Sequence, residues 1–100
     1  MIATALIEKG KDGTFGVFTP DINHTIIGDG DTVEEAIADF ENSVEEMILS
    51  YTEIGREIPE ELKDIQFTYK YDIASISENQ KDKIERTLHS LGNELAAIKL

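Results

Sequence analysis

The side chains that could do chemistry in this chain are mostly carboxylates. Aspartate and glutamate number 21 against nine lysines and arginines, which gives a formal net charge of -12. A two-metal nuclease site needs several carboxylates converging on the ions, one of them in the middle of the first strand. Only Glu8, Glu34 or Glu35, and Asp72 stand near suitable positions, and residues 2–7 contain no acid. We therefore expect neither catalytic residues nor a bound metal.

Two short motifs are better explained by helix capping than by a ligand. Asp29, Asp31 and Glu34 are spaced like part of a calcium loop, but the twelve-residue ligand pattern is absent. The Gly-Asp-Gly at 28–30 lacks the third glycine and the preceding strand–helix context of a dinucleotide fingerprint. We expect no cofactor.

Histidine and cysteine usage also speaks against a site. His24 and His89 have no partner at metal or nucleophile spacing, so both are expected at the surface. The chain has no cysteine, which excludes a disulfide framework and fits a reducing compartment. Residues 1–7 are apolar but too short for a membrane span and follow no basic region. We expect a cytoplasmic protein that does not enter a membrane.

The negative charge is concentrated in the middle of the chain. Residues 31–64 hold twelve acids against Arg56 and Lys63, a net charge of -10. Phosphate contacts need lysine and arginine, so direct nucleic-acid binding by this segment is not expected. The block suits either a well-solvated surface or a surface that attracts and orients a basic protein partner.

A long helix over residues 33–54 must present these acids. Thr32 and Glu35 form the pattern of a capping box at its start, and Gly55 stands where a left-handed residue usually ends a helix. Apolar residues recur three and four apart, as on one helix face. They are Val33, Ala36, Ile37, Phe40, Val44, Met47, Ile48 and Tyr51.

Four strands are expected around this helix, at residues 2–8, 14–19, 25–27 and 66–72. The first is apolar on both faces, which predicts a central position, and Asp12-Gly13 is a hairpin signal. The predicted fold is therefore α+β, a two-layer β-β-β-α-β module with the long helix on one face of a four-stranded sheet. We expect Phe40 to pack on the face that carries Phe67, Tyr69 and Tyr71.

Residues 1–72 carry an ordered set of motifs that resembles the N-terminal domain of HicB-type antitoxins. The resemblance implies a reduced ribonuclease-H-like fold that neutralises a HicA-type toxin, a small basic RNA-cleaving protein. Longer members add a DNA-binding domain that represses the operon. One departure is residues 22–25, where many relatives carry a Pro-Gly turn. The matching pieces are Asp12-Gly13 with Phe15 and Val17, Pro20-Asp21, the GDTVEEAI of residues 30–37, and Gly55 with Ile58-Pro59.

The acidic block and the neighbourhood of the fourth strand predict the toxin-binding residues. We expect the partner to contact Glu34, Glu41, Glu45, Phe18 and Lys70. Two other functions are weighed against the antitoxin: a DNA-binding repressor of a toxin–antitoxin operon and, more weakly, a metal-dependent ribonuclease-H-like nuclease.

Residues 73–100 are expected to form a linker and one amphipathic helix, separate from the first 72 residues. Ser77 and Gln80 can cap it, and the segment resembles the last helix of a Cro/repressor-type helix-turn-helix domain. Because the DNA-reading helices are missing, operator binding is not carried over. The apolar seam could cover the sheet face bearing Phe18 or pair with a second chain, and its spacing favours a symmetric homodimer. The seam residues are Ile84, Leu88, Leu91, Leu95 and Ile98.

Overall fold

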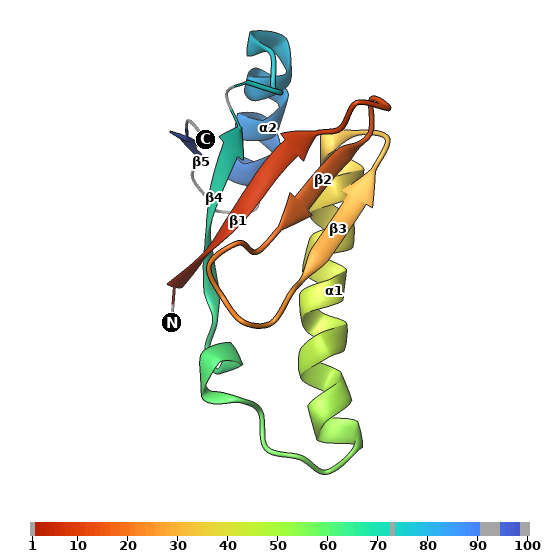
Figure 1. The fold of residues 1–100 in the computed structure, drawn as a ribbon, viewed down its shortest axis with the longest axis vertical. Helices are drawn as coiled ribbons and strands as arrows, with labels where there is room; N and C mark the ends of the chain where they lie inside the picture. Colours follow the sequence, from red (N-terminus) through yellow and green to blue (C-terminus); the bar gives the residue numbers. More distant parts are fainter. Residues whose placement is uncertain (1, 73, 91–94, 99–100) are drawn as a thin grey trace.

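The protein is an α+β fold in the computed structural model, which describes residues 2–72, 74–90 and 95–98. Three strands precede a long helix, and a strand, a shorter helix and a short strand follow it (Figure 1). A 3₁₀ turn, η1, leads into the fourth strand. The elements are β1 (Ile2–Lys9), β2 (Phe15–Phe18), β3 (Ile27–Gly30), α1 (Val33–Glu53), η1 (Glu60–Leu62), β4 (Gln66–Asp72), α2 (Glu78–Ser90) and β5 (Leu95–Ile98).

The strands form one mixed sheet in the order β3-β2-β1-β4-β5. β1 pairs antiparallel with β2 and parallel with β4, which confirms its predicted central position. Its side chains are buried on both faces, Ala5 and Ile7 on one and Leu6 on the other. The β1–β2 hairpin turns at Gly13, whose φ of 88° is a left-handed conformation that glycine adopts without strain.

Helix α1 begins and ends where its capping residues predict. The Thr32 hydroxyl accepts a hydrogen bond from the Glu35 N–H at 3.1 Å. The Glu35 carboxylate in turn accepts from the Asp31 N–H, one residue earlier than in a standard capping box. At the other end Gly55 has a φ of 70°, and the Arg56 N–H donates to the Tyr51 carbonyl in a Schellman arrangement.

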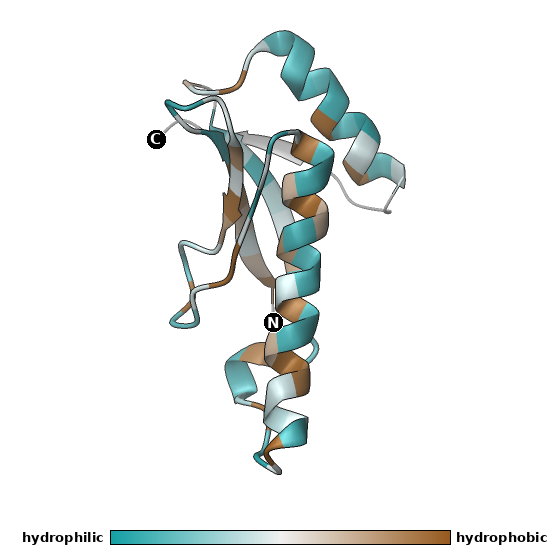
Figure 2. Cartoon of the chain, turned by 90° about the vertical axis from the view of Figure 1, so that its right-hand side faces the viewer, coloured by the Kyte–Doolittle hydropathy of each residue, from teal (hydrophilic) through white to brown (hydrophobic). Residues whose placement is uncertain are grey.

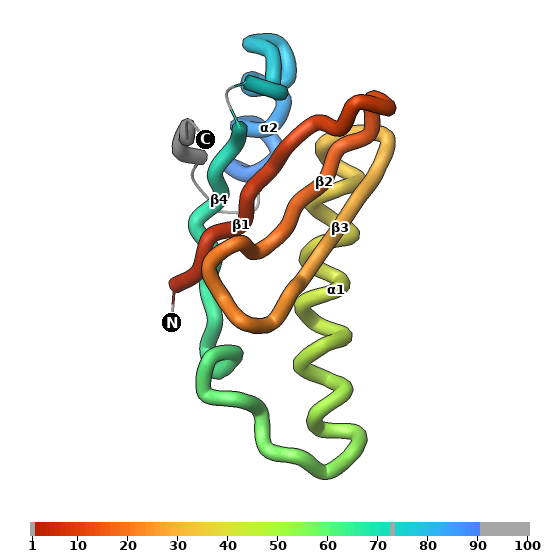
Figure 3. The backbone as a smooth tube through the Cα atoms, in the orientation of Figure 1, coloured from red at the N-terminus to blue at the C-terminus, as the bar shows by residue number. Residues whose placement is uncertain are grey.

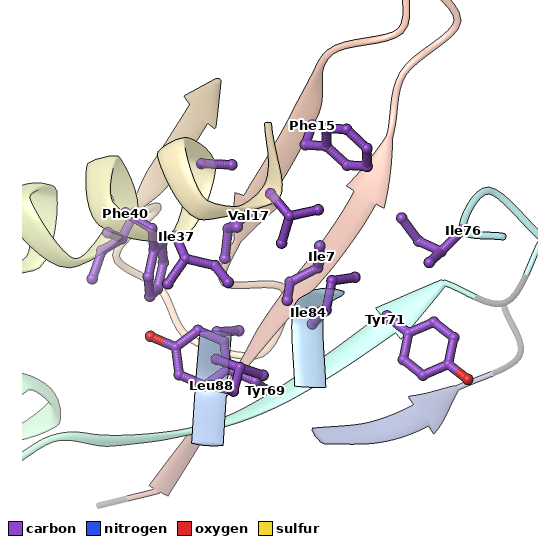
Figure 4. Close-up of a cluster of buried hydrophobic side chains, with 14 of the residues drawn as sticks. Ile7, Phe15, Val17, Ile37, Phe40, Tyr69, Tyr71, Ile76, Ile84 and Leu88 are labelled. Atoms are coloured by element: carbon purple, nitrogen blue, oxygen red, sulfur yellow. The ribbon is translucent and has the colours of Figure 1, made fainter. Parts of the chain in front are cut away.

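Both helices cover the same face of the sheet and close one hydrophobic core (Figure 2). Phe40 is fully buried, and its ring meets those of Phe67 and Tyr69 edge-on, with centroids 5.1 and 6.2 Å away. This confirms the predicted packing of α1. Figure 4 shows Ile84 and Leu88 of α2 in the same cluster as Ile7 and Tyr69.

Two glycines let α1 approach β3 closely. A Cβ atom on Gly28 would lie 2.2 Å from the backbone nitrogen of Phe40, and one on Gly30 would lie 2.6 Å from the Glu35 Cβ. β3 runs from Ile27 to Gly30 and pairs with β2, so both glycines lie inside a strand. The strand predicted at 25–27 was therefore placed two to three residues too early.

The predicted single helix through residue 98 was also wrong. Ser77 and Gln80 do cap α2, with the Ser77 N–H donating to the Gln80 side chain at 3.0 Å. The helix ends at Ser90, however, and Leu95–Ile98 forms β5, which pairs in parallel with β4. The free edge of β4 offers backbone hydrogen bonds that a helix continued to residue 98 could not use.

The predicted dimer seam is therefore divided. Ile84 and Leu88 are fully buried in the core of their own chain, on the face opposite Phe18. Leu95 and Ile98 belong to β5, and Leu91 lies outside the described residues. The two parts that the sequence separates at residue 72 share one core.

Candidate protein-binding surface

The second half of α1, residues 41–53, extends past the sheet as an arm (Figures 1 and 3). All four buried side chains of α1 lie in its first half. In the arm, Val44, Met47, Ile48 and Tyr51 are only half-buried, and Leu49 is 58% exposed. Several apolar side chains on one segment that its own chain covers incompletely make that segment a candidate site for another molecule.

A groove runs between the arm and the start of β4, and we name it the α1–β4 groove. It has a volume of about 520 Å³, within the range of sites that hold side chains or small ligands. Two adjoining hollows share lining residues with it: Val44 and Ile65 line one, and Glu45 lines the other. The groove is lined by Glu41, Val44, Glu45, Ile65, Gln66, Phe67 and Tyr69.

The charge around the groove has one sign. Helix α1 carries seven carboxylates and no lysine, arginine or histidine. Across the described residues, no ion pair reaches these seven acids. The nearby Lys63 lies 3.5 Å from Glu57 and 3.3 Å from Glu60, so its charge is already balanced. The arm therefore presents a negative potential that a cation would relieve.

Tyr69 holds one of these carboxylates at the edge of the groove. Its hydroxyl donates to Glu41 Oε1 at 3.0 Å, while its ring is buried beneath. Burial, and then the negative charge of Glu41, raises the pKa of the Tyr69 hydroxyl far above its ordinary value. Tyr69 thus remains a proton donor to the Glu41 carboxylate throughout the physiological range.

The structure brings together two of the predicted acids and separates the third. Glu41 and Glu45 both line the α1–β4 groove. Glu34 is exposed in the first turn of α1 and lines a different, smaller hollow beside Lys83 of α2. Eleven residues separate Glu34 from Glu45, which is about 16 Å along the helix axis.

Phe18 and Lys70 lie on the sheet face that the helices leave uncovered, on either side of Leu6. Strand register places both opposite Leu6, and Phe18 in turn pairs with Ile27. Leu6 is buried, Phe18 and Lys70 are half-buried, and Ile27 is 58% exposed. The five predicted binding residues therefore divide among the α1–β4 groove, the hollow beside Lys83 and the uncovered sheet face, and one flat partner cannot contact all of them.

A carboxylate clamp, which sequence reasoning missed, joins η1 to the β2–β3 loop. Glu61 accepts from the Asn23 N–H at 3.0 Å and from His24 Nδ1 at 2.5 Å. The Asn23 hydrogen bond, followed by that of His24, lowers the pKa of Glu61. Leu62, the next residue after Glu61, is buried in the core. The clamp and Leu62 together hold η1, the segment that faces the arm. His24 was expected at the surface without a partner, and the separation of 37 residues leaves no local signal for this pair.

The acids weighed for a nuclease lie apart. Glu8 and Asp72 occupy the uncovered sheet face by strand alternation, whereas Glu34 lies on α1 beyond the opposite face. Within residues 2–72, 74–90 and 95–98, no three histidine, aspartate or glutamate side chains gather as metal ligands. In the same ranges, no helix has the length and apolar character to cross a bilayer.

The side chains of the groove can bind a partner through apolar contact and charge. Its lining combines the half-buried apolar side chains of Val44, Ile65 and Phe67 with the carboxylates of Glu41 and Glu45. Comparison of the chain with known protein families, with curated proteins and with solved structures finds no match.

Proposed function

We propose that this chain is a HicB-like antitoxin that binds a small basic HicA-type ribonuclease toxin and neutralises it by occlusion. The observation that carries the proposal is the α1 arm, where carboxylates with no cationic partner among the described residues line a groove together with half-buried apolar side chains. A basic, RNA-cleaving protein must expose lysine or arginine to hold phosphates. The arm offers those side chains the complementary charge.

The arrangement of the sheet supports the fold that this proposal requires. The elements follow the order β-β-β-α-β and continue with α-β, and β1 lies in the centre of a mixed sheet. We propose that the module is a reduced ribonuclease-H-like fold used for protein binding. Residues 1–72 with α2 and β5 then act as one binding unit, because Ile84 and Leu88 complete its core.

At such an interface, charge and apolar contact are expected to act at different steps of binding. Opposed charges accelerate the encounter, whereas desolvated apolar contacts slow dissociation. Glu41 and Glu45 are expected to act in the first step, and Val44, Ile65 and Phe67 in the second.

The test is the kinetics of binding to the product of the neighbouring gene, which the proposed function requires to be a small basic protein. We expect the association rate to fall steeply as salt rises from about 50 to about 500 mM, while the dissociation rate changes little. The same complex should abolish the RNA cleavage of the basic protein. A flat association rate, or a neighbouring protein that neither binds nor cleaves RNA, would contradict the antitoxin function.

A further inference from the structure

We infer that the α1–β4 groove binds a cationic amphipathic segment of the partner, with an apolar side chain on Val44, Ile65 and Phe67 and lysine or arginine at Glu41 and Glu45. The inference rests on the proposed function for the basic character of the partner. It adds the docking site, the face of the molecule and the chemistry of the segment that docks.

The lining of the groove defines two layers of contact. We call the three apolar lining residues, Val44, Ile65 and Phe67, the groove floor. Each is half-buried, so a partner that covers it removes further apolar surface from water. Glu41 and Glu45 stand four residues apart on one side of α1, so a single helical turn carries both. A segment with an apolar stripe flanked by cations matches both layers, as amphipathic helices do in grooves.

Charge excludes a second copy of this chain as the occupant of the groove. Each arm has four carboxylates and no cation, so two arms placed groove to groove would bring together eight negative charges. Like charges at an interface oppose association strongly, and the described part of the arm offers no base to offset them. A partner of opposite charge is attracted to the groove, whereas a second copy of the chain is repelled.

The uncovered sheet face offers a less uniform charge. Its apolar row, Ile27, Phe18 and Leu6, continues into Lys70, and the carboxylates of that face lie in the next row. A cationic segment placed over the apolar row would meet Lys70, whereas no lysine, arginine or histidine lines the groove. The groove is thus the surface that better fits a basic amphipathic segment, and the open face serves as a comparison.

The first experiment measures binding of a labelled amphipathic helical peptide of leucine and lysine to the full chain by fluorescence anisotropy. A scrambled peptide of the same composition controls for charge alone. The double variant Glu41→Gln, Glu45→Gln should weaken binding of the amphipathic peptide about tenfold or more. The double variant Glu34→Gln, Glu78→Gln makes the same charge change at exposed first-turn positions of α1 and α2, outside the arm and the groove, and should weaken it less than about threefold.

A second matched pair tests the apolar floor. Ile65→Thr places a hydroxyl on the groove floor, and Ile27→Thr makes the same change on the open sheet face. Ile65→Thr should weaken peptide binding several-fold, and Ile27→Thr should leave it unchanged. Thermal unfolding of each variant tests whether weaker peptide binding comes from a loss of fold. The glutamine variants change side chains that are exposed or half-exposed, so we expect them to keep wild-type stability.

Each outcome decides the inference. Equal loss from the two glutamine pairs, or equal binding of the two peptides, means attraction by net charge alone and overturns the groove. A wild-type dimer in sedimentation that Ile65→Thr dissociates would identify a second copy as the occupant and overturn the choice of partner.

Binding of the neighbouring basic protein separates this inference from the proposed function. If that protein binds the groove variants as tightly as wild type, the groove is wrong and the antitoxin function stands. If it does not bind at all, the antitoxin function is wrong, and the peptide data alone decide the groove.

Discussion

The two halves of α1 share one helix and one pattern of apolar residues, yet they have different surroundings. The first half lies against β3 so closely that Gly28 and Gly30 leave no room for a Cβ, and its apolar side chains are fully buried. The second half lies past the sheet beside η1, and its apolar side chains are half-buried. Identical periodicity thus produces core at one end of the helix and accessible surface at the other.

The difference follows from how much sheet lies under each half. β3 is only four residues long and ends beside the first turns of α1, so the helix extends beyond the strand on which it packs. A helix of 21 residues is about 31 Å long. We interpret the first half as the element that stabilises the fold and the second as the element that binds.

The largest expected effect separates the two halves by stability. Phe40→Ala removes a fully buried ring from the contact with Phe67 and Tyr69 and should reduce the free energy of unfolding by about 3–5 kcal/mol. Leu49→Ala, in the exposed part of the arm, should change it by less than about 0.5 kcal/mol. Denaturant melts of both variants measure the contrast, and similar losses would remove the distinction between the halves.

Helix α2 extends the buried region toward the C-terminal part of the chain. Leu88 is fully buried, so Leu88→Ala should destabilise the monomer by about 2–5 kcal/mol. Light scattering with a denaturant melt distinguishes this role from the seam of a dimer. If the variant kept wild-type stability and only dissociated a dimer, α2 would not belong to the core.

The close approach of α1 to β3 is tested by adding one methyl group. Gly28→Ala places a Cβ against the Phe40 backbone and should destabilise the fold by about 1–3 kcal/mol or more, because the helix has to move. Gly16→Ala, where the nearest atom to the new Cβ is 4.0 Å away, is the matched control and should be nearly neutral. Equal melting temperatures for the two variants would contradict the packing of the first half.

The smallest effect concerns the clamp beside the arm. The folded protein lowers the pKa of Glu61 below its ordinary value of 4.5, so its carboxylate contributes stability above that value. The contribution should be lost as the pH falls through the lowered pKa. The difference in melting temperature between wild type and Glu61→Gln should therefore be largest near neutral pH and should shrink in acid, whereas a difference that grows in acid would show the opposite sign of the shift.

Local signals predicted much of the fold. Both ends of α1 were predicted from Thr32, Glu35 and Gly55. The bounds of β4 were predicted from the alternation in residues 66–72. Leu95 and Ile98 misled because their spacing continues the α2 pattern, whereas the edge of β4 that they pair with is formed by a distant segment. The Gly-Asp-Gly at 28–30 was interpreted as part of a helix-capping motif, because the close approach of Gly28 to Phe40 is a tertiary contact that no local pattern indicates.

The candidate site was predictable in charge but not in shape. Glu41 and Glu45 were expected from the acidic block, yet the groove needs Ile65 and Phe67, which reach it only after η1 returns the chain to the sheet. Phe18 and Lys70 were assigned to the same partner as these acids. Strand register, which no local pattern of either residue determines, places them on the other face.

The most direct test of the binding role of the arm is hydrogen–deuterium exchange of the full chain with and without the product of the neighbouring gene, which the proposed function requires to be a small basic protein. Amides in residues 41–53 and 65–67 should exchange more slowly in the complex, because the arm and groove are then covered. Amides of β2 and β3 on the uncovered sheet face should exchange at the same rate in both states. Protection confined to β2 and β3, with no change along the arm, would contradict the assignment of binding to the second half of α1.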